Sequence, residues 1–421
     1  MTQVIDMKKL FIFSIIVLLL VGFFNLFSSS AKAQDNNNHT PGQVLVKFKD
    51  GVSQTQKDSL LRNNRAKVVS KINALEVLVL QVPQTAEEKV VTALSKNPHV
   101  DYAELDYIAE AFFTPNDTYF NRQWGLENTK QVINGVTGVE DADIDASTAW
   151  DTVLGSVKVA ILDSGINQNH EELVTKIAAS QDFTGSTFGY DDIYGHGTHV
   201  AGIVAALTNN GKGVVGVCPN CILLNGKVLN DSGSGAYSWI ANGITWATKN
   251  DAKVINMSLG GSSPSKTLES AVNYAWKTGV VVVAAAGNSN NPSKTYPAAY
   301  TNAIAVAATD NQDKKAYFSS YGAKWVDVAA PGVFVFSTWK GTTSNANPQP
   351  ECDITGCYKY ASGTSMSTPI VSGVVGLIWS TSSYGTSASA VRTRLESTAD
   401  KISGTGTYWS KGRVNAANAV K

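Results

Sequence analysis

From about residue 114 onward, the chain alternates apolar runs with segments whose apolar positions recur at helical spacing. Strands that are apolar on both faces are typical of a parallel sheet covered by helices on both sides. We therefore expect an α/β fold with a mostly parallel sheet in residues 113–421. Four runs carry this prediction, each ending in a polar or glycine-rich turn: VKVAILD, AKVINMSLG, GVVVVAAAGN and AIAVAATD.

The region before this pattern alternates shorter runs of two kinds. Strand-like alternation occurs in QVLVKF and LEVLVLQV, and helical spacing in QTQKDSLLRNN and TAEEKVVTALSKN. Residues 43–106 therefore predict a small α+β domain, and no cluster of catalytic residue types is visible in it.

The first residues are typical of an export signal. A basic MKK is followed by the apolar run LFIFSIIVLLLVGFF and by AKA at 31–33, which predicts a signal peptide at 1–33 that is cut after Ala33. An uncleaved membrane anchor is the alternative, because the apolar run is long. No second run of this kind appears, so we expect a secreted, extracellular protein with no membrane contact after cleavage.

Charge and cysteine content narrow the function further. The 421 residues carry a formal net charge of zero and no basic block beyond the N-terminus, which argues against a nucleic-acid partner. Four cysteines form two local pairs, CPNC at 218–221 and CDITGC at 352–357. An oxidising compartment favours two short disulfides, although four cysteines allow three pairings and C-x-x-C can be a redox motif. The segment 342–360 is predicted to be a surface insertion.

The stretch ASGTSMSTPIVSG opens a helix with a serine. Helical spacing runs from Ser365 to Ser380, and Pro369 falls early in it, where a first helical turn tolerates proline. Ser365 then lies near the helix N-terminus, which favours a developing anion. An N-cap role is the alternative for this serine.

A serine becomes a nucleophile only when a base removes its proton. Among five histidines, His39 and His99 belong to the N-terminal region, and His196 stands between glycines at the start of an apolar helix. His196 is the candidate base, whereas His199 is expected to be packed and hydrogen-bonded. A metal site on these two histidines lacks an H-E-x-x-H pattern or a nearby third ligand.

Two further residues complete the candidate site. Asp163 follows an apolar strand and can orient the base, with a turn cap as its alternative role. Asn288 ends another strand and can donate to an oxyanion beside the Ser365 backbone N–H. The chain order Asp, His, Ser is that of subtilisin, and the G-x-S-x-G elbow of esterases is absent from the sequence.

The blocks AILDSGI, GHGTHVAG, AAAGN and GTSMSTP resemble the four signature blocks of the subtilisin-like serine proteases. Stretches such as TNNGKGVVG and YPAAYTNAIAVAATD are most similar to the thermitase-like branch. The resemblance implies a triad of Asp163, His196 and Ser365, with Asn288 as oxyanion donor. It also implies a monomeric endopeptidase that holds protein or peptide substrates as an added strand. The implied substrate-binding residues are Gly233, Ser234, Gly235, Ser258, Leu259 and Gly260.

Residues 34–112 are similar to the linker and inhibitory propeptide of that family, a ferredoxin-like domain that acts as intramolecular chaperone and inhibitor. The end of this region implies self-cleavage between Phe112 and Phe113. Phe112 would then occupy the specificity pocket and Ala109 an outer one, which implies a preference for aromatic or large apolar residues before the cut.

The same resemblance implies one structural Ca²⁺ site built from oxygen ligands. Glu172 replaces the aspartate usual in that family, and Lys212 could offer only its backbone oxygen. The alternative is a solvated polar loop. The implied ligands are Asp117, Glu172, Leu207, Asn210, Lys212 and Val214.

Two other classes of protein remain as alternatives. A binding module on the same fold would be favoured by a substituted triad position, and none is substituted. An ester hydrolase with little peptidase activity is disfavoured by the strand-forming cleft, and parallel peptide and ester assays would separate the two.

Overall fold

The computed structural model describes residues 39–108, 113–341, 350–352 and 356–421. The chain divides after residue 110 into two compact units, each described by itself. The predicted signal peptide and the residues Ala109 and Phe112 lie outside the described residues. Within the described ranges, no helix is long and apolar enough to cross a membrane.

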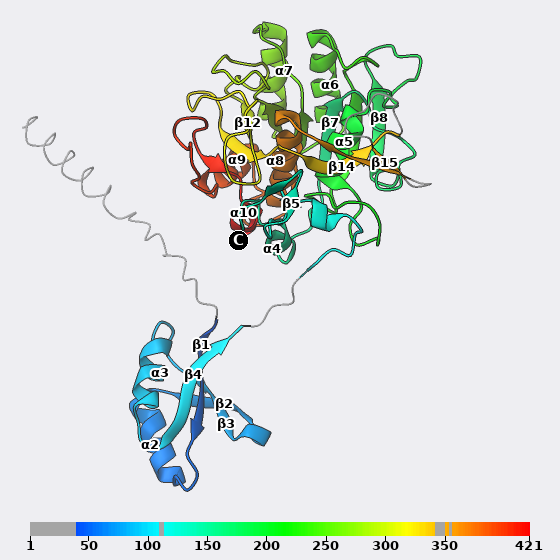
Figure 1. Cartoon of the computed structure of the whole chain (residues 1–421). Helices are drawn as coiled ribbons and strands as arrows, with labels where there is room; N and C mark the ends of the chain where they lie inside the picture. Colours follow the sequence, from blue (N-terminus) through cyan, green and yellow to red (C-terminus); the bar gives the residue numbers. More distant parts are fainter. Residues whose placement is uncertain (1–38, 109–112, 342–349, 353–355) are drawn as a thin grey trace, which may run out of the picture. The chain divides into compact units, whose positions relative to one another are not determined.

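The N-terminal unit is an antiparallel sheet with two helices, in the order β-α-β-β-α-β (Figure 1). Its strand order is β2-β3-β1-β4, which is the ferredoxin-like arrangement and confirms the predicted α+β domain. The core residues Val44, Leu61, Leu80 and Leu94 come from both helices and two of the strands. The elements are β1 (His39–Phe48), α2 (Gln54–Asn63), β2 (Lys67–Ile72), β3 (Val77–Gln81), α3 (Glu87–Ser95) and β4 (Val100–Tyr107).

The C-terminal unit is built on an eight-stranded sheet in the order β17-β13-β12-β11-β10-β7-β9-β8. Each neighbouring pair is parallel, so the predicted parallel sheet is confirmed. The strands are β7 (Lys158–Asp163), β8 (Ile177–Asp182), β9 (Ile222–Lys227), β10 (Val254–Met257), β11 (Val281–Ala285), β12 (Ala303–Thr309), β13 (Val328–Pro331) and β17 (Gly412–Arg413).

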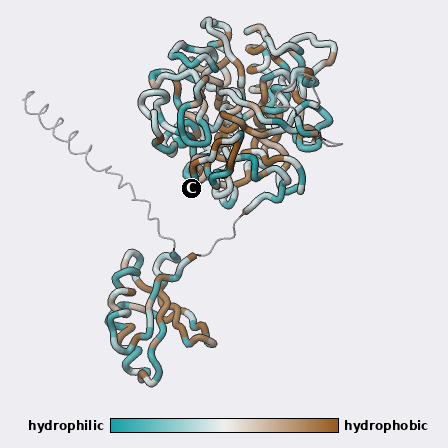
Figure 2. Tube along the Cα trace, viewed as in Figure 1, coloured by the Kyte–Doolittle hydropathy of each residue, from teal (hydrophilic) through white to brown (hydrophobic). Residues whose placement is uncertain are grey.

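Helices cover both faces of this sheet, and alternate residues of one strand face different layers. Val159 and Ile161 pack in the core that contains α5 and α8, whereas Ala160 and Leu162 pack in the core that contains α6 and α7. Figure 2 shows hydrophobic stretches gathered inside this unit and polar stretches along its periphery. The helices are α4 (Ala146–Trp150), α5 (His196–Ala205), α6 (Tyr237–Lys249), α7 (Lys266–Lys277), α8 (Thr364–Trp379), α9 (Ala388–Ser397) and α10 (Ala416–Val420).

A small antiparallel sheet of β14 (Val335–Trp339), β16 (Cys357–Ala361) and β15 (Glu351–Cys352) lies against α5. The segment predicted to be a surface insertion therefore ends in a paired strand. Tyr358 in β16 is buried because its ring packs against Phe336 of β14.

The cysteines form the two local disulfides, Cys218–Cys221 and Cys352–Cys357, as the sequence favoured. Both sulfurs of the first bond are buried, which argues against the redox alternative. The first pair lies in a loop at residues 213–221, and the strand β9 begins directly after Cys221.

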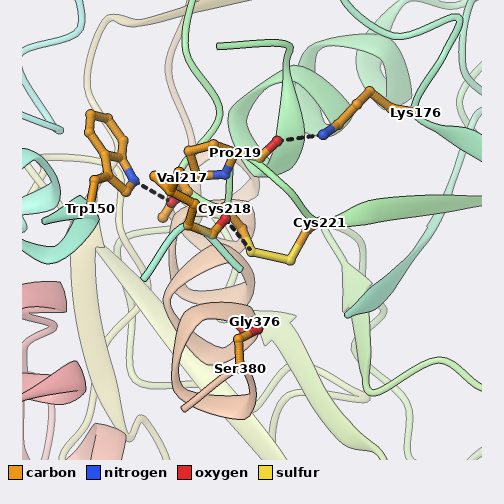
Figure 3. The surroundings of a disulfide bond; sticks show 9 residues. Trp150, Lys176, Val217, Cys218, Pro219, Cys221, Gly376 and Ser380 are labelled. Atoms are coloured by element: carbon orange, nitrogen blue, oxygen red, sulfur yellow. Dashed lines mark hydrogen bonds between the residues drawn. A yellow bond between two sulfur atoms is a disulfide. The ribbon is translucent and has the colours of Figure 1, made fainter. Parts of the chain in front are cut away.

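This loop packs against the side of α8 (Figure 3). A Cβ atom placed on Gly376 would lie 2.9 Å from Cys221 Sγ, so the helix can approach the disulfide only with glycine there. The Trp150 indole donates to the Val217 carbonyl at 3.0 Å, and the buried Lys176 ammonium donates to the Pro219 carbonyl. Burial lowers the pKa of Lys176 to about 8.

Candidate active site

The carboxyl end of β7 meets the N-terminus of α5 at one hydrogen bond. Asp163 is the last residue of β7 and His196 is the first residue of α5. The His196 Nδ1–H donates to Asp163 Oδ1 at 2.7 Å. Asp163 is fully buried, whereas the His196 side chain is 21% exposed, so the far side of the imidazole can reach a substrate.

Opposing influences act on the pKa of His196. Burial is the largest and favours the neutral ring. The charge of Asp163, its hydrogen bond and the charge of Asp192 together outweigh burial, so the pKa is raised above its ordinary value. The imidazolium that forms when the ring accepts a proton is therefore stabilised by the carboxylate behind it.

Asp192, which no sequence pattern singled out, organises the start of α5. Its two carboxylate oxygens accept backbone N–H groups of Tyr194, Gly195 and Thr198. The Ser164 hydroxyl also donates to Asp192, at 2.9 Å, so the carboxylate links the end of β7 to the helix. Asp192 lies four residues before the first residue of α5, whose N-cap position is Gly195, so the usual N-cap pattern does not point to it.

His199 has the structural environment that the sequence predicted. It is buried, and its Nε2 lies 2.9 Å from the Lys359 carbonyl oxygen. Burial lowers the pKa of His199 to about 3, so the ring is neutral. His199 therefore packs α5 against β16.

Helix α8 presents Ser365 as its second residue. The Ser365 backbone N–H thus belongs to the first turn, where N–H groups have no partner within the helix. Its hydroxyl donates to the Ser258 carbonyl at 3.1 Å. In the described part of the chain, no hydrogen bond joins Ser365 to His196, and such bonds are often long before substrate binds.

The expectation that Pro369 lies in the first turn of this helix is wrong. Pro369 is the sixth residue of α8, since the helix begins at Thr364. A proline at this depth leaves the carbonyl four residues earlier without its helical donor.

Asn288 follows β11 and is oriented by the start of α8. Its Oδ1 accepts the Thr364 backbone N–H at 2.9 Å and the Thr364 hydroxyl at 3.0 Å. Two donors on this oxygen fix the orientation of the side-chain amide. The Nδ2 end is therefore the end that can donate to an oxyanion.

Two pockets adjoin these groups. One, of about 410 Å³, is lined by His196, Tyr194, Ser258 and the predicted segment 233–235. The other, of about 510 Å³, is lined by Ser365, Asn288, Gly260 and Thr295. Leu259 lines both, so the structure brings the predicted substrate-binding residues to the same region as the predicted triad.

The predicted calcium residues supply two buried carboxylates. Asp117 Oδ2 accepts the Asn209 N–H at 2.8 Å, but Asp117 Oδ1 is buried without a hydrogen-bond partner among the described residues. Glu172 is fully buried, and its oxygens accept the Asn210 side-chain amide at 3.2 Å and the Tyr358 hydroxyl at 3.3 Å.

These carboxylates fit a hard cation. Burial, together with the charges of Asp117 and Glu171, raises the pKa of Glu172 to about 8. An unpartnered carboxylate oxygen beside a second buried acid is costly unless a cation is bound. The described residues contain no group of three or more His, Cys, Asp or Glu side chains suited to a metal, and the predicted set has only two carboxylates.

The remaining predicted ligands lie in the loop after α5. The Leu207 N–H donates to the Glu172 carbonyl at 3.1 Å, and the Asn210 Oδ1 accepts the Lys212 N–H at 2.9 Å. The Lys212 ammonium pairs with Glu171 at 2.9 Å, so only the backbone oxygen of Lys212 could face a cation. Val214 is buried next to this loop.

Comparisons with known families agree with this geometry. The subtilase family matches residues 155–416, and the fervidolysin N-terminal prodomain matches residues 27–106.

Individual relatives include thermitase from Thermoactinomyces vulgaris, 48% identical over 73% of this chain and 100% of the relative. A thermophilic serine proteinase from Bacillus sp. strain AK1 is 41% identical over 92% of this chain and 89% of its own. Subtilisin E from Bacillus subtilis strain 168 is 37% identical over 98% of this chain and 99% of its own. A solved protease structure from Pseudoalteromonas arctica PAMC 21717 shares 33% identity with a TM-score of 0.62, covering 73% of this chain and 99% of that chain.

Proposed function

Because the chain belongs to the subtilase family of serine endopeptidases and carries an N-terminal prodomain, we propose that it is a secreted peptidase acting through Ser365. The observation that carries this assignment is the 2.7 Å bond between Asp163 and His196, at a site that also holds Ser365 and Asn288. Secretion rests on the export signal at 1–33.

In the proposed reaction, the Ser365 hydroxyl turns from the Ser258 carbonyl toward His196 when substrate binds. His196 Nε2 takes the proton as Oγ attacks the peptide carbonyl carbon. The Asn288 amide and the Ser365 N–H donate to the resulting oxyanion. His196 then protonates the leaving amine, and water hydrolyses the acyl-enzyme with His196 again as base.

We propose that the substrate lies as an added strand between segments 233–235 and 258–260. The residue before the cut would enter the pocket of about 510 Å³, because both Ser365 and Asn288 line it. This volume suits aromatic or large apolar side chains, in line with Phe112 at the expected maturation site.

The proposed calcium ligands are Asp117 and Glu172, together with oxygens of the loop residues Leu207, Asn210, Lys212 and Val214. Bound Ca²⁺ would neutralise the two buried carboxylates and hold the loop after α5 to the N-terminal segment of this unit. The support is the unpartnered Asp117 Oδ1 beside the buried Glu172.

We further propose that the enzyme removes its own propeptide near Phe112–Phe113, and that this domain first serves as chaperone and inhibitor. Intact mass and N-terminal sequence of the secreted product test this, with wild type compared with Ser365→Ala. Wild type should start near Phe113 and the variant near Gln34. Identical trimming of both would assign maturation to another protease, and no trimming of either would count against the peptidase.

A further inference from the structure

Pro369 leaves a carbonyl of the candidate nucleophile without its helical donor. In an α-helix, the N–H of residue 369 would donate to the carbonyl of residue 365. Proline has no N–H, and its ring crowds that carbonyl. The Ser365 carbonyl must therefore find a partner outside its own helix or stay unsatisfied.

Ser258 supplies that partner from the end of β10. Its hydroxyl donates to the Ser365 carbonyl at 2.8 Å, and Ser258 is only 3% exposed, so bulk water has little access to replace the bond. In the opposite direction, the Ser365 hydroxyl donates to the Ser258 carbonyl at 3.1 Å. Two hydrogen bonds thus join the two serines across the junction of sheet and helix.

The Ser258 hydroxyl is itself held by a buried chain of hydrogen bonds. Asn256 Nδ2 donates to Ser258 Oγ at 3.1 Å, and the Ser372 hydroxyl donates to Asn256 Oδ1 at 2.9 Å. Asn256 and Ser372 are fully buried. In this series of hydrogen bonds Ser372 donates to Asn256, Asn256 to Ser258, and Ser258 to Ser365. Because the bonds run in one direction, each polarises and strengthens the next. Helix α8 is therefore bonded to β10 at its first turn and again two turns later.

We propose that the Ser258 side chain is a positioning residue for the nucleophile, an inference that rests on the proposed role of Ser365. Its hydroxyl takes the place of the N–H that Pro369 lacks and fixes the first turn of α8. That turn carries both groups the chemistry needs, the Ser365 hydroxyl and the Ser365 backbone N–H. A small displacement of this turn would misalign attack and oxyanion donation together.

The first test is Ser258→Ala, with kcat and KM measured on a peptide nitroanilide. Active sites are counted by titration with a sulfonyl fluoride, so that misfolded protein does not enter the rate. We expect kcat to fall about 10- to 100-fold, with KM changed less than about 2-fold. Substrate contacts to the backbone of 258–260 remain in this variant, which is why KM should hold.

The deciding test is rescue by Pro369→Ala. Alanine restores an N–H that can donate to the Ser365 carbonyl, so the double variant should recover kcat to within about 3-fold of Pro369→Ala alone. An unchanged kcat in Ser258→Ala would overturn the proposal. A loss of kcat that Pro369→Ala does not relieve would also overturn it, because the hydroxyl would then act in some other way.

Ser367→Ala is the matched control. Ser367 is another buried serine of α8, and its hydroxyl donates to the Ala330 carbonyl of β13 at 3.0 Å. This variant should lose stability without the selective fall in kcat. If Ser258→Ala does not fold, kcat of the double variant is compared with kcat of Pro369→Ala alone. That ratio still measures what the Ser258 hydroxyl contributes when residue 369 has an N–H. A wild type without peptidase activity would instead refute the proposed function, which is a separate outcome.

Discussion

Glu172→Gln should change stability in opposite directions with and without calcium. Glu172 is fully buried, and burial raises its pKa from 4.5 to about 8 in the calcium-free protein. Because the folded-state pKa lies above the unfolded one, the folded state is favoured by protonation. That stabilising contribution is complete below about pH 4.5 and is lost as the pH rises through about 8.

The size of the effect follows from the two pKa values. They differ by about 3.5, and each pH unit corresponds to about 1.4 kcal/mol, so the calcium-free wild type loses about 5 kcal/mol by about pH 9. Glutamine cannot ionise and avoids this loss. It can also keep both hydrogen bonds, accepting from Asn210 and donating to the Tyr358 oxygen. At about 2–4 °C for each kcal/mol, the calcium-free variant should melt about 10–20 °C above wild type at high pH.

Calcium should reverse this order. A bound cation pairs with the Glu172 carboxylate, so the wild type no longer loses stability as that group ionises. The glutamine variant offers one charge fewer to the cation and should gain less from it. Wild type is therefore expected to be the more stable protein when calcium is present.

The assay is thermal unfolding by circular dichroism, on mature enzyme blocked with a sulfonyl fluoride to prevent autolysis. Melting temperatures are compared near pH 5 and near pH 9, with calcium or with chelator. Glu269→Gln is the control, because Glu269 pairs with Lys266 on α7 and should show no calcium-dependent reversal. A calcium-free variant less stable than wild type at high pH would refute the reasoning, as would an equal calcium response in both proteins.

Three further changes test other parts of the structure. Asn288→Ala should lower kcat about 10²- to 10³-fold with little change in KM, and a proportional rise in KM would contradict its oxyanion role. Asp163→Asn should lower kcat/KM about 10⁴-fold. Since Asp163 raises the pKa of His196, the acid limb of the pH–rate profile should move to lower pH, and an unmoved limb would count against this pairing. Gly376→Ala should lower the free energy of unfolding by about 1–3 kcal/mol, because the new Cβ would lie 2.9 Å from Cys221 Sγ. A loss of the same size in a protein that lacks this disulfide would contradict the explanation.

Local sequence patterns were sufficient to predict the strands of the main sheet and to single out Asp163, His196, Asn288 and Ser365 as candidate site residues. Runs apolar on both faces predicted the parallel sheet, and polar residues at the ends of such strands predicted where Asp163 and Asn288 would lie. The short spacings between cysteines favoured the two disulfides, because the cysteines of each pair are only three and five residues apart and are therefore close in space in any fold. These features depend on neighbours in the sequence, so the sequence alone carries them.

The partners of buried polar groups were decided only by tertiary structure. Ser258 and Ser365 are separated by more than a hundred residues, yet each accepts a hydrogen bond from the other. The environment of Glu172 likewise depends on Tyr358, which arrives on a strand that the sequence suggested was a surface insertion. Hydrogen bonds of this kind are chosen when elements pack, because a buried donor or acceptor must be satisfied by whatever group packing brings within reach.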